Sequence, residues 1–367
     1  MTALPHPALP EPAVVLCIVS ILLVPFSIAG LSLINTGLGR SRSASHLMLA
    51  SLCVMGVAGL VYFACGSAFE GFIGQPAHVF ELAGKTWNWL GASPFFLRDL
   101  GLRGSRAWLA AWLGMVSVGL AAVIPLGSGA DRWRLSASCA STALLAGWTY
   151  PLFAHWVWGG GWLAQLGATC GLGHGFVDVG GASSIQVVGG LTALSIAWIL
   201  GPRQGKHGPG GMMLALPGHN AVYVLFGCML ALLGWLGLDF AGAILFNGVD
   251  PAWAAQIGIN VTLAAPAGAL AAAAITRARF GKPDASLSAN GWVSGLVASS
   301  AACAFVTPAA AVFIGLVAGA LVTLSVEWLD LKFGVDDPGG AISVHAVCGI
   351  WGLLAAGVFG HFPVNVM

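Results

Sequence analysis

Ten apolar stretches, each close to the length of a membrane-spanning helix, constrain this chain more than any other feature. They cover residues 13–35, 46–68, 107–127, 136–157, 183–201, 213–238, 253–275, 285–305, 309–330 and 341–360. A helix of about 20 mostly apolar residues spans the hydrocarbon core of a bilayer. The sequence therefore predicts an all-α polytopic membrane protein with about ten transmembrane helices in a single transmembrane domain.

Composition supports the same class of protein. Of the 367 residues, 58% are hydrophobic and only 7% are charged, whereas a soluble domain carries roughly 25% charged residues. The formal net charge of +1 leaves no basic stripe for a nucleic-acid partner. Residues 1–12 lack the basic region of a cleaved signal peptide, so we expect the first apolar stretch to remain in the mature protein.

The residue patterns of enzymes and metal sites are absent from the sequence. Its eight cysteines are scattered and form no CxxC pair, which indicates neither a disulfide framework nor a zinc site. No HExxH, GxSxG or P-loop motif occurs. We therefore predict a protein that is not an enzyme and that needs no cofactor or metal.

Lysine and arginine alternate between the two sides of the predicted helices. The loops after the first, third, fifth, seventh and ninth stretches carry Arg40, Arg42, Arg132, Arg134, Arg203, Lys206, Arg277, Arg279, Lys282 and Lys332. The opposite loops carry only Lys85, Arg98, Arg103 and Arg106, all within the segment 70–106. Because cytoplasmic loops are enriched in basic residues, both termini are predicted to lie outside the cytoplasm.

A short motif before the fifth stretch recurs before the tenth. Asp178-Val-Gly-Gly-Ala-Ser-Ser-Ile-Gln186 and Asp337-Pro-Gly-Gly-Ala-Ile-Ser-Val-His345 share Asp, Gly-Gly-Ala and Ser at the same offsets. Repetition of this kind indicates an internal duplication. An odd number of spans per copy inverts the second copy, so we predict two inverted repeats, at about 13–201 and 213–360, with a site near the midplane where they meet.

The last residue of each copy is the strongest candidate for function. Gln186 and His345 occupy equivalent positions about two helical turns after their Asp, so we expect them to face each other near the bilayer centre. A polar side chain there is costly and is a functional-site hypothesis by default. An amide and a neutral imidazole can line a narrow pore without adding a full charge. The alternative is a histidine that only packs and bonds to backbone.

Other polar and aromatic residues allow two interpretations each. Asp178 and Asp337 stand where Asp caps a helix N-terminus, but Asp178 could also orient backbone carbonyls toward an incoming cation. Trp158, in Ala154-His-Trp-Val-Trp-Gly-Gly-Gly161, fits an interfacial aromatic belt or a cation-attracting face at a pore mouth. Asp239 is expected at the interface or satisfied by packing.

Several segments together resemble the ammonium transporter (Amt/Mep/Rh) family. They are Ala130-Asp-Arg-Trp-Arg134, the His155–Gly161 run, Asp178 with Gly180-Gly181, and Asp336-Asp-Pro-Gly-Gly-Ala-Ile-Ser-Val-His-Ala-Val-Cys-Gly-Ile-Trp-Gly352. Weaker matches involve His219-Asn220, Gly234-Trp235 and residues 290–296. The resemblance covers about residues 13–360, and its last block is the most specific.

The resemblance implies a fold and a set of roles. It implies a trimer of eleven-helix subunits, each with a narrow pore lined by two histidines, an outer site with Trp and Ser, and two stacked Phe rings. By position, Trp158 corresponds to the outer aromatic residue, Asp178 to the acidic residue that supports the outer site, and His345 to the second pore histidine. Trp235 is predicted to support the pore.

This chain departs from that pattern at several positions. Gln186 stands in place of the first pore histidine, and a glutamine amide does not titrate near neutral pH as imidazole does. Gly242 falls on the outer-site serine, Leu238 on the inner Phe and Ser117 near the outer Phe. The chain ends seven residues after Gly360, which predicts that the eleventh helix and the cytoplasmic tail are missing.

The leading hypothesis is an inner (plasma) membrane protein that conducts ammonium or ammonia through a narrow pore in each subunit of a homotrimer. Its expected partners are the small permeant and membrane lipid. One alternative is a channel for another small neutral species, such as water, a gas or an alkylamine. The other is a non-conducting ammonium-binding sensor derived from the transporter fold.

Overall fold

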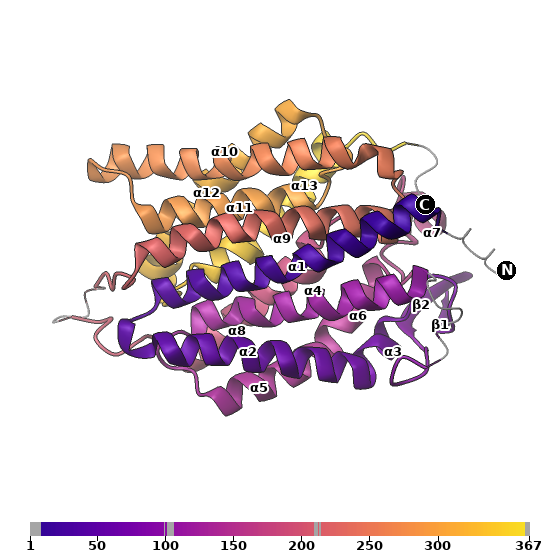
Figure 1. The fold of residues 1–367 in the computed structure, drawn as a ribbon, viewed down its shortest axis with the longest axis horizontal. Helices are drawn as coiled ribbons and strands as arrows, with labels where there is room; N and C mark the ends of the chain where they lie inside the picture. Colours follow the sequence, from indigo (N-terminus) through magenta and orange to yellow (C-terminus); the bar gives the residue numbers. More distant parts are fainter. Residues whose placement is uncertain (1–8, 99, 101–105, 209–211, 213, 364–367) are drawn as a thin grey trace.

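The computed structural model describes residues 9–98, 100, 106–208, 212 and 214–363 and shows a bundle of roughly aligned helices (Figure 1). Arg103 and residue 213, the predicted start of the sixth stretch, lie outside the described residues. Helical segments occupy the positions of all ten predicted stretches, so the expected all-α polytopic fold is confirmed.

The first half of the chain contributes five membrane-length rods. Their elements are α1 (Glu11–Leu38); η1 (Ser41–Ser43), α2 (Ala44–Val61), η2 (Tyr62–Gly66) and α3 (Ser67–Glu70); α4 (Arg106–Gly129); α5 (Leu135–Leu144), η3 (Leu145–Thr149) and α6 (Tyr150–Val157); and η4 (Ala182–Val187) with α8 (Val188–Leu200). The short helix α7 (Leu166–Cys170) lies between α6 and η4.

The second half contributes the other five rods. They are α9 (Ala221–Asn247); η6 (Pro251–Trp253) with α10 (Ala254–Phe280); α11 (Ala285–Ser300); α12 (Pro308–Phe333); and η7 (Ile342–Val347) with α13 (Cys348–Phe359). Within the described part of the chain, eight of the ten rods are long and apolar enough to cross a membrane. The α5–α6 rod and the 16-residue α11 are the other two.

The sixth helix is displaced from its predicted position. It was expected at 213–238, but α9 begins at Ala221, because the Asn220 side chain accepts the N–H groups of Val222 and Tyr223 as a cap. The helix then continues to Asn247, so Asp239 lies two turns inside it. The prediction ended the helix too early because it treated Asp239 as a residue of the membrane surface.

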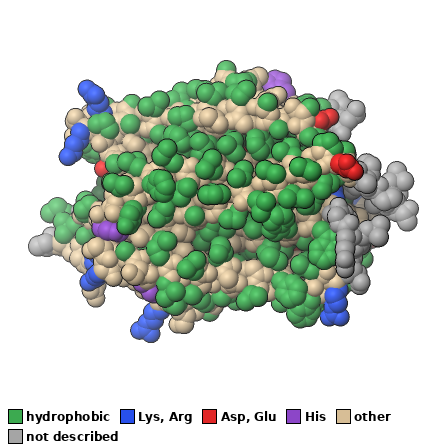
Figure 2. Space-filling view, viewed as in Figure 1, with side chains coloured by type: hydrophobic (Ala, Val, Ile, Leu, Met, Phe, Trp, Pro, Cys, Tyr) green, Lys and Arg blue, Asp and Glu red, His purple; other side chains and the backbone are tan. Residues whose placement is uncertain are grey.

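A β-hairpin that the sequence analysis missed covers one end of the bundle. Strands β1 (Ala77–Leu82) and β2 (Lys85–Gly91) pair antiparallel. Figure 1 shows the hairpin and α7 at the same end as the start of α1 and the end of α13. In Figure 2 hydrophobic side chains cover the flank of the bundle, while most of the visible Lys and Arg side chains gather at the opposite end. The charge asymmetry therefore follows the loop pattern of the sequence.

The two halves meet most extensively between α1 and α9. Glycines bring the two backbones together: a Cβ at Gly30 would lie 2.5 Å from the Gly227 carbonyl oxygen, and one at Gly227 would lie 2.6 Å from that of Gly30. Small residues allow such approach where lipid provides no hydrophobic drive for association. We call this glycine-lined contact between α1 and α9 the seam.

Helix contacts in the first half recur in the second. The pairs α2·α4, α2·α5 and α4·α8 correspond to α10·α11, α10·α12 and α11·α13. Matched pairs of this kind are what a duplicated five-helix unit would make. The exact division into repeats at 13–201 and 213–360 stays a prediction.

Charged side chains tie three loops together at the basic end of the bundle. Arg203 binds Asp336 through Nε (2.9 Å) and Nη2 (3.0 Å), and reaches Asp131 at 3.3 Å. Arg132 also contacts Asp336, at 3.3 Å. Burial raises the pKa of the Asp336 carboxyl, but the hydrogen bonds and charges of Arg203 and Arg132 outweigh burial and leave that pKa below its ordinary value. We call these residues the basic-end charge cluster.

Candidate functional site

The duplicated motif folds into two matching turns. The Asp178 carboxylate accepts the backbone N–H groups of Gly181, Ala182, Ser183 and Ser184 at 2.7–3.3 Å. Asp178 therefore caps the helix N-terminus, as one of its two interpretations predicts.

The second copy repeats this geometry at the same offsets. Asp337 accepts from Ala341 (3.1 Å) and Ile342 (2.8 Å). The glycine three residues after each aspartate, Gly181 or Gly340, adopts a positive φ of 87° or 67°, a conformation that glycine adopts readily. Each cap opens a π-helical turn, η4 or η7, and π turns within helices are frequent at functional sites.

Gln186 and His345 project from η4 and η7 and touch each other. The Nδ1 atom of His345 lies 2.7 Å from Oε1 of Gln186, and both side chains are buried, at 4% and 0% exposed. The expectation that they face each other is thereby confirmed, and the interpretation of His345 as a histidine bonded only to backbone is wrong.

Glycines allow the turns that carry Gln186 and His345 to lie this close together. A Cβ at Gly349 would lie 2.8 Å from the Ala182 carbonyl oxygen, and one at Gly190 would lie 2.8 Å from the Ala346 Cβ. Any larger residue at these two positions would push the π turns apart.

The chemistry of the pair follows from its contact. An amide oxygen only accepts hydrogen bonds, so His345 donates through Nδ1, and Nε2 keeps an unshared lone pair. Among the described residues the Gln186 amide nitrogen has no hydrogen-bond partner, and neither have the Ser184 and Ser343 hydroxyls, which occupy equivalent positions in the two motif copies. Buried polar groups are normally paired, so these three groups are free to bond to a further polar partner.

Trp158 lies between this pair and the hairpin-bearing end of the chain, buried and fixed on two sides. Its Nε1 donates to the Asp178 carbonyl oxygen at 2.7 Å, and its ring stacks on Phe246, with centroids 4.4 Å apart and planes inclined by 9°. Asp178 thus caps η4 with its carboxylate and holds Trp158 with its carbonyl group. Sequence reasoning missed Phe246, because a helix that ends at residue 238 leaves this ring in a loop.

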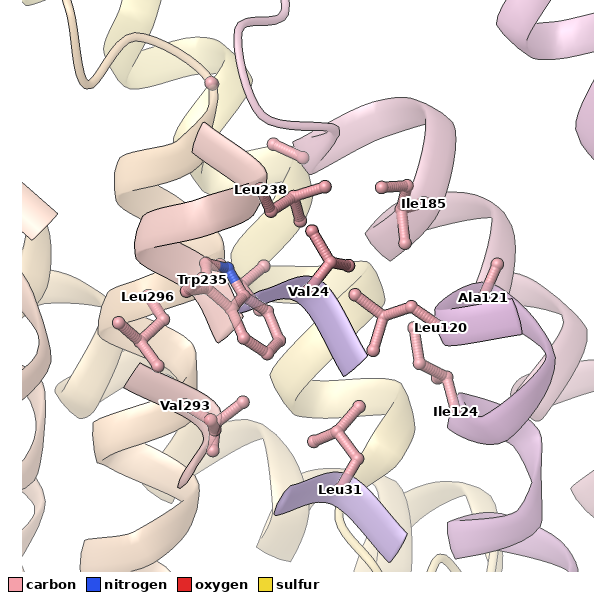
Figure 3. Close-up of a cluster of buried hydrophobic side chains, with 14 of the residues drawn as sticks. Val24, Leu31, Leu120, Ala121, Ile124, Ile185, Trp235, Leu238, Val293 and Leu296 are labelled. Carbon is pink, nitrogen blue, oxygen red and sulfur yellow. The ribbon is translucent and has the colours of Figure 1, made fainter. Parts of the chain in front are cut away.

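Leu238 and Trp235 belong to the apolar interior beside the π turn η4. Figure 3 shows Leu238 directed toward Ile185, with Val24 next to both. Trp235 is fully buried, with Val293 and Leu296 nearby in the same view, and its Nε1 donates to the Ser300 hydroxyl at 3.1 Å. The two residues fill space next to the candidate pore.

This geometry agrees with the comparisons with known proteins. The sequence model of the Ammonium Transporter Family matches residues 14–367. The chain belongs to the ammonium transporter family. As a member it is a multi-pass membrane protein and an ammonium transporter or channel by descent.

Similar proteins occur in several kingdoms. Ammonium transporter Amt2 of Archaeoglobus fulgidus is 37% identical over 341 residues, which make up 92% of this chain and 69% of that protein. A putative ammonium transporter, sll1017, of Synechocystis sp. is 31% identical over 92% of this chain and 73% of its own length.

Solved structures share the fold. The structure titled Sensor Amt Protein aligns with a TM-score of 0.85 at 28% identity and covers 95% of this chain and 82% of that chain. Mep2 of Candida albicans aligns with a TM-score of 0.83 at 24% identity, over 97% of this chain and 75% of that chain, and supports the fold alone.

The structure explains one departure from the ammonium transporter family pattern. Gly242 faces the Val179 carbonyl oxygen so closely that a Cβ would overlap it. A serine therefore has no room here, although the family pattern expects one. The assignment of Gly242 and Leu238 to an outer recruitment site stays a prediction, as do the roles of the other site residues.

The structure corrects the predicted position of Asp239. It was expected at the interface or satisfied by packing, yet it is completely buried, and within the described part of the chain neither carboxyl oxygen has a hydrogen-bond partner. Its Oδ1 lies against Gly180, in the loop that leads from Asp178 to η4.

Proposed function

We propose that this protein conducts ammonium nitrogen across the membrane through a pore in which Gln186 and His345 form the central contact. The observation that supports this proposal most directly is the buried 2.7 Å contact between these two side chains, where the two matched π turns meet. Ammonium and ammonia both donate N–H groups, and the free lone pair of His345 Nε2 can accept one.

The pair favours a neutral permeant at the pore centre. Neither side chain carries a charge in the arrangement described above, and a full charge is expensive in the middle of a bilayer. Ammonium therefore gives its proton to water at the pore entrance before it reaches the pair, and ammonia crosses it. Because a glutamine amide does not titrate near neutral pH, the proton cannot pass from imidazole to imidazole here, and a current requires that the released proton cross by a path other than this pair.

The test is solid-supported-membrane electrophysiology on the purified protein in liposomes. Ammonium, methylammonium and potassium are pulsed over the natural protein and over His345→Ala, with His361→Ala, an exposed histidine, as the matched control. We expect an ammonium current that His361→Ala keeps and that His345→Ala abolishes or makes permeable to potassium. Absence of current with every cation in sealed vesicles would refute electrogenic transport.

A non-conducting ammonium sensor is the second candidate function. It is favoured by the 28% identical structural relative titled Sensor Amt Protein and by the amide in place of the first histidine. A sensor predicts saturable ammonium binding without current and without ammonia flux, the latter measured as internal alkalinisation of vesicles in a stopped-flow instrument. A channel for water, a gas or an alkylamine predicts flux of that species instead.

The number of subunits, the membrane and the side of the termini are also part of this proposal. We propose a homotrimer in the inner (plasma) membrane with both termini outside the cytoplasm, on the basis of the family resemblance and the distribution of basic residues. Native mass spectrometry of the detergent-solubilised protein would report the subunit number directly.

A further inference from the structure

Five polar side chains gather where α2–α3, α4 and α6 meet, away from the Gln186–His345 pair. They are Tyr62, Ser67, Glu70, Ser117 and Tyr150, and all are at most 2% exposed. Among the described residues, the hydroxyls of Tyr62, Ser67, Ser117 and Tyr150 and Oε2 of Glu70 make no hydrogen bond of good geometry. Their nearest polar neighbours lie within the cluster, where Tyr62 adjoins Glu70 and Tyr150 adjoins Ser117. So many unpaired buried polar groups are unusual in a native structure and indicate a missing ligand.

Four of these side chains, those of Tyr62, Glu70, Ser117 and Tyr150, lie close together. A Cβ at Gly114 on α4 would lie 2.8 Å from Cζ of Tyr62 and 3.2 Å from Oε2 of Glu70, so the phenol and the carboxyl group approach the same spot. The Tyr62 and Tyr150 rings meet edge to face with centroids 6.4 Å apart. Tyr150 in turn lies beside Ser117, one turn along α4 from Gly114.

Two π turns shape this cluster. Tyr62 opens η2, and Tyr150 directly follows η3. The two turns contact each other and both contact α4. Each extra residue in a π turn shifts the side chains that follow it, and the shift after η3 applies to Tyr150.

The carboxyl group of Glu70 lacks a counter-charge. No salt bridge of the described residues involves it, and no basic side chain acts on it electrostatically. The adjacent His155 is already engaged, with Nδ1 2.6 Å from the Glu70 carbonyl oxygen and Nε2 2.8 Å from Oδ1 of Asn88. An ionised Glu70 therefore needs a cation from solution.

We propose that Tyr62, Glu70, Ser117 and Tyr150 form a second binding site for a monovalent, hydrogen-bond-donating cation, with ammonium as its ligand. One carboxylate matches one positive charge, and three hydroxyl oxygens supply acceptors for the remaining N–H groups. This inference rests on the proposed function for the identity of the cation. It adds a site that is separate from the Gln186–His345 pair.

The position of the cluster connects it to the pore. Tyr150 is within electrostatic range of Asp178, and α4 and α6 both contact η4, which carries Gln186. Ser117 is also the position that the resemblance places near the outer Phe, so a small side chain stands there instead of a ring. The helices that would hold a cation at Glu70 therefore also contact the turn that carries Gln186.

The test measures ammonium binding separately from transport. The thermal unfolding midpoint of the detergent-solubilised protein is titrated with ammonium chloride, with choline chloride as the ionic control. Glu70→Gln keeps the size of the side chain and removes its charge. Tyr62→Phe and Tyr150→Phe each remove one hydroxyl group. The matched control is Glu81→Gln, which changes an exposed glutamate of the hairpin. Vesicle currents of the same proteins give the half-saturating ammonium concentration.

We expect ammonium to raise the midpoint of the natural protein and of Glu81→Gln, and Glu70→Gln to abolish that rise. The half-saturating concentration should increase about 10-fold in Glu70→Gln, as for the loss of one charge-assisted hydrogen bond. The Phe variants retain the charge and test the site even if Glu70→Gln fails to fold: each should weaken the response.

Three other outcomes decide between this inference and the proposed transport. An unchanged ammonium response in Glu70→Gln and both Phe variants overturns this inference and leaves the proposed transport intact. A Glu70-dependent response without any current supports the second site and removes electrogenic transport. A potassium response equal to the ammonium response would contradict a site built for a hydrogen-bond donor.

Discussion

At the scale of single residues, the close approach of α9 to the loop after Asp178 depends on Gly242. The Val179 carbonyl oxygen occupies the space that a side chain at Gly242 would need. Because that loop also carries the Asp178 carbonyl group to Trp158, packing at Gly242 and the position of Trp158 are coupled.

Gly242→Ser, which restores the residue type expected from the family, should therefore destabilise this protein. Overpacking of a buried site costs roughly 1–3 kcal/mol, and we expect a lower thermal unfolding midpoint. Gly357→Ser is the control, because a Cβ at Gly357 on α13 meets open space. Equal midpoints for both variants would show that the loop after Asp178 yields easily.

Single residues also show how far sequence reasoning could go. Duplication of the motif was sufficient to pair Gln186 with His345, because equivalent positions in inverted copies meet near the symmetry axis. It could not find Phe246 or the Glu70 cluster. Phe246 meets Trp158 only because α9 continues to Asn247, and the unpaired groups around Glu70 come from three elements that are distant in sequence.

At the scale of elements, apolar length predicted the rods well and their ends less well. The fifth and tenth helices start within one residue of their predictions, because an Asp cap and a glycine with positive φ define each start. The sixth helix was misplaced, since an aspartate inside a membrane helix contradicts the usual pattern. The hairpin β1–β2 gave no apolar signal strong enough to separate it from a loop.

The basic-end charge cluster holds loops between elements together, and the folding stability that it contributes should depend on pH. The folded pKa of Asp336 lies below its ordinary value, so its contribution to folding stability is fully present above the unfolded pKa of about 3.9. That contribution is lost as pH falls through the lower folded pKa. We expect Asp336→Asn to destabilise the protein at pH 7 and to reduce its further loss of stability in acid.

Thermal unfolding midpoints of the natural protein and Asp336→Asn, measured from pH 7 to pH 3, test this expectation. Glu327→Gln is a suitable control, because Glu327 pairs with Arg279 on a more exposed surface, at 25% and 42% side-chain exposure, where ion pairs contribute little. Parallel curves for the natural protein and Asp336→Asn would show that Asp336 does not titrate with folding.

At the scale of the whole molecule, the charge distribution predicts which end faces the cytoplasm. Cys170, in α7 at the hairpin-bearing end, is exposed. A membrane-impermeant maleimide added to intact cells should therefore label the natural protein. Cys170→Ser should abolish that labelling, because the other cysteines are buried or only partly exposed. Labelling only after the membrane is permeabilised would reverse the proposed orientation.

The seam between α1 and α9 has a consequence for the kind of motion that transport can use. Many secondary transporters work by rocking one repeat against the other. Here the two backbones are in direct contact at Gly30 and Gly227, with no side chains between them. A rocking motion would therefore cause steric clashes between the helices or open a gap to lipid. The two halves behave as one rigid frame. Under the proposed function, selectivity then depends on a fixed aperture, and transport depends on the loss of water and of a proton by the permeant rather than on movement of the two halves.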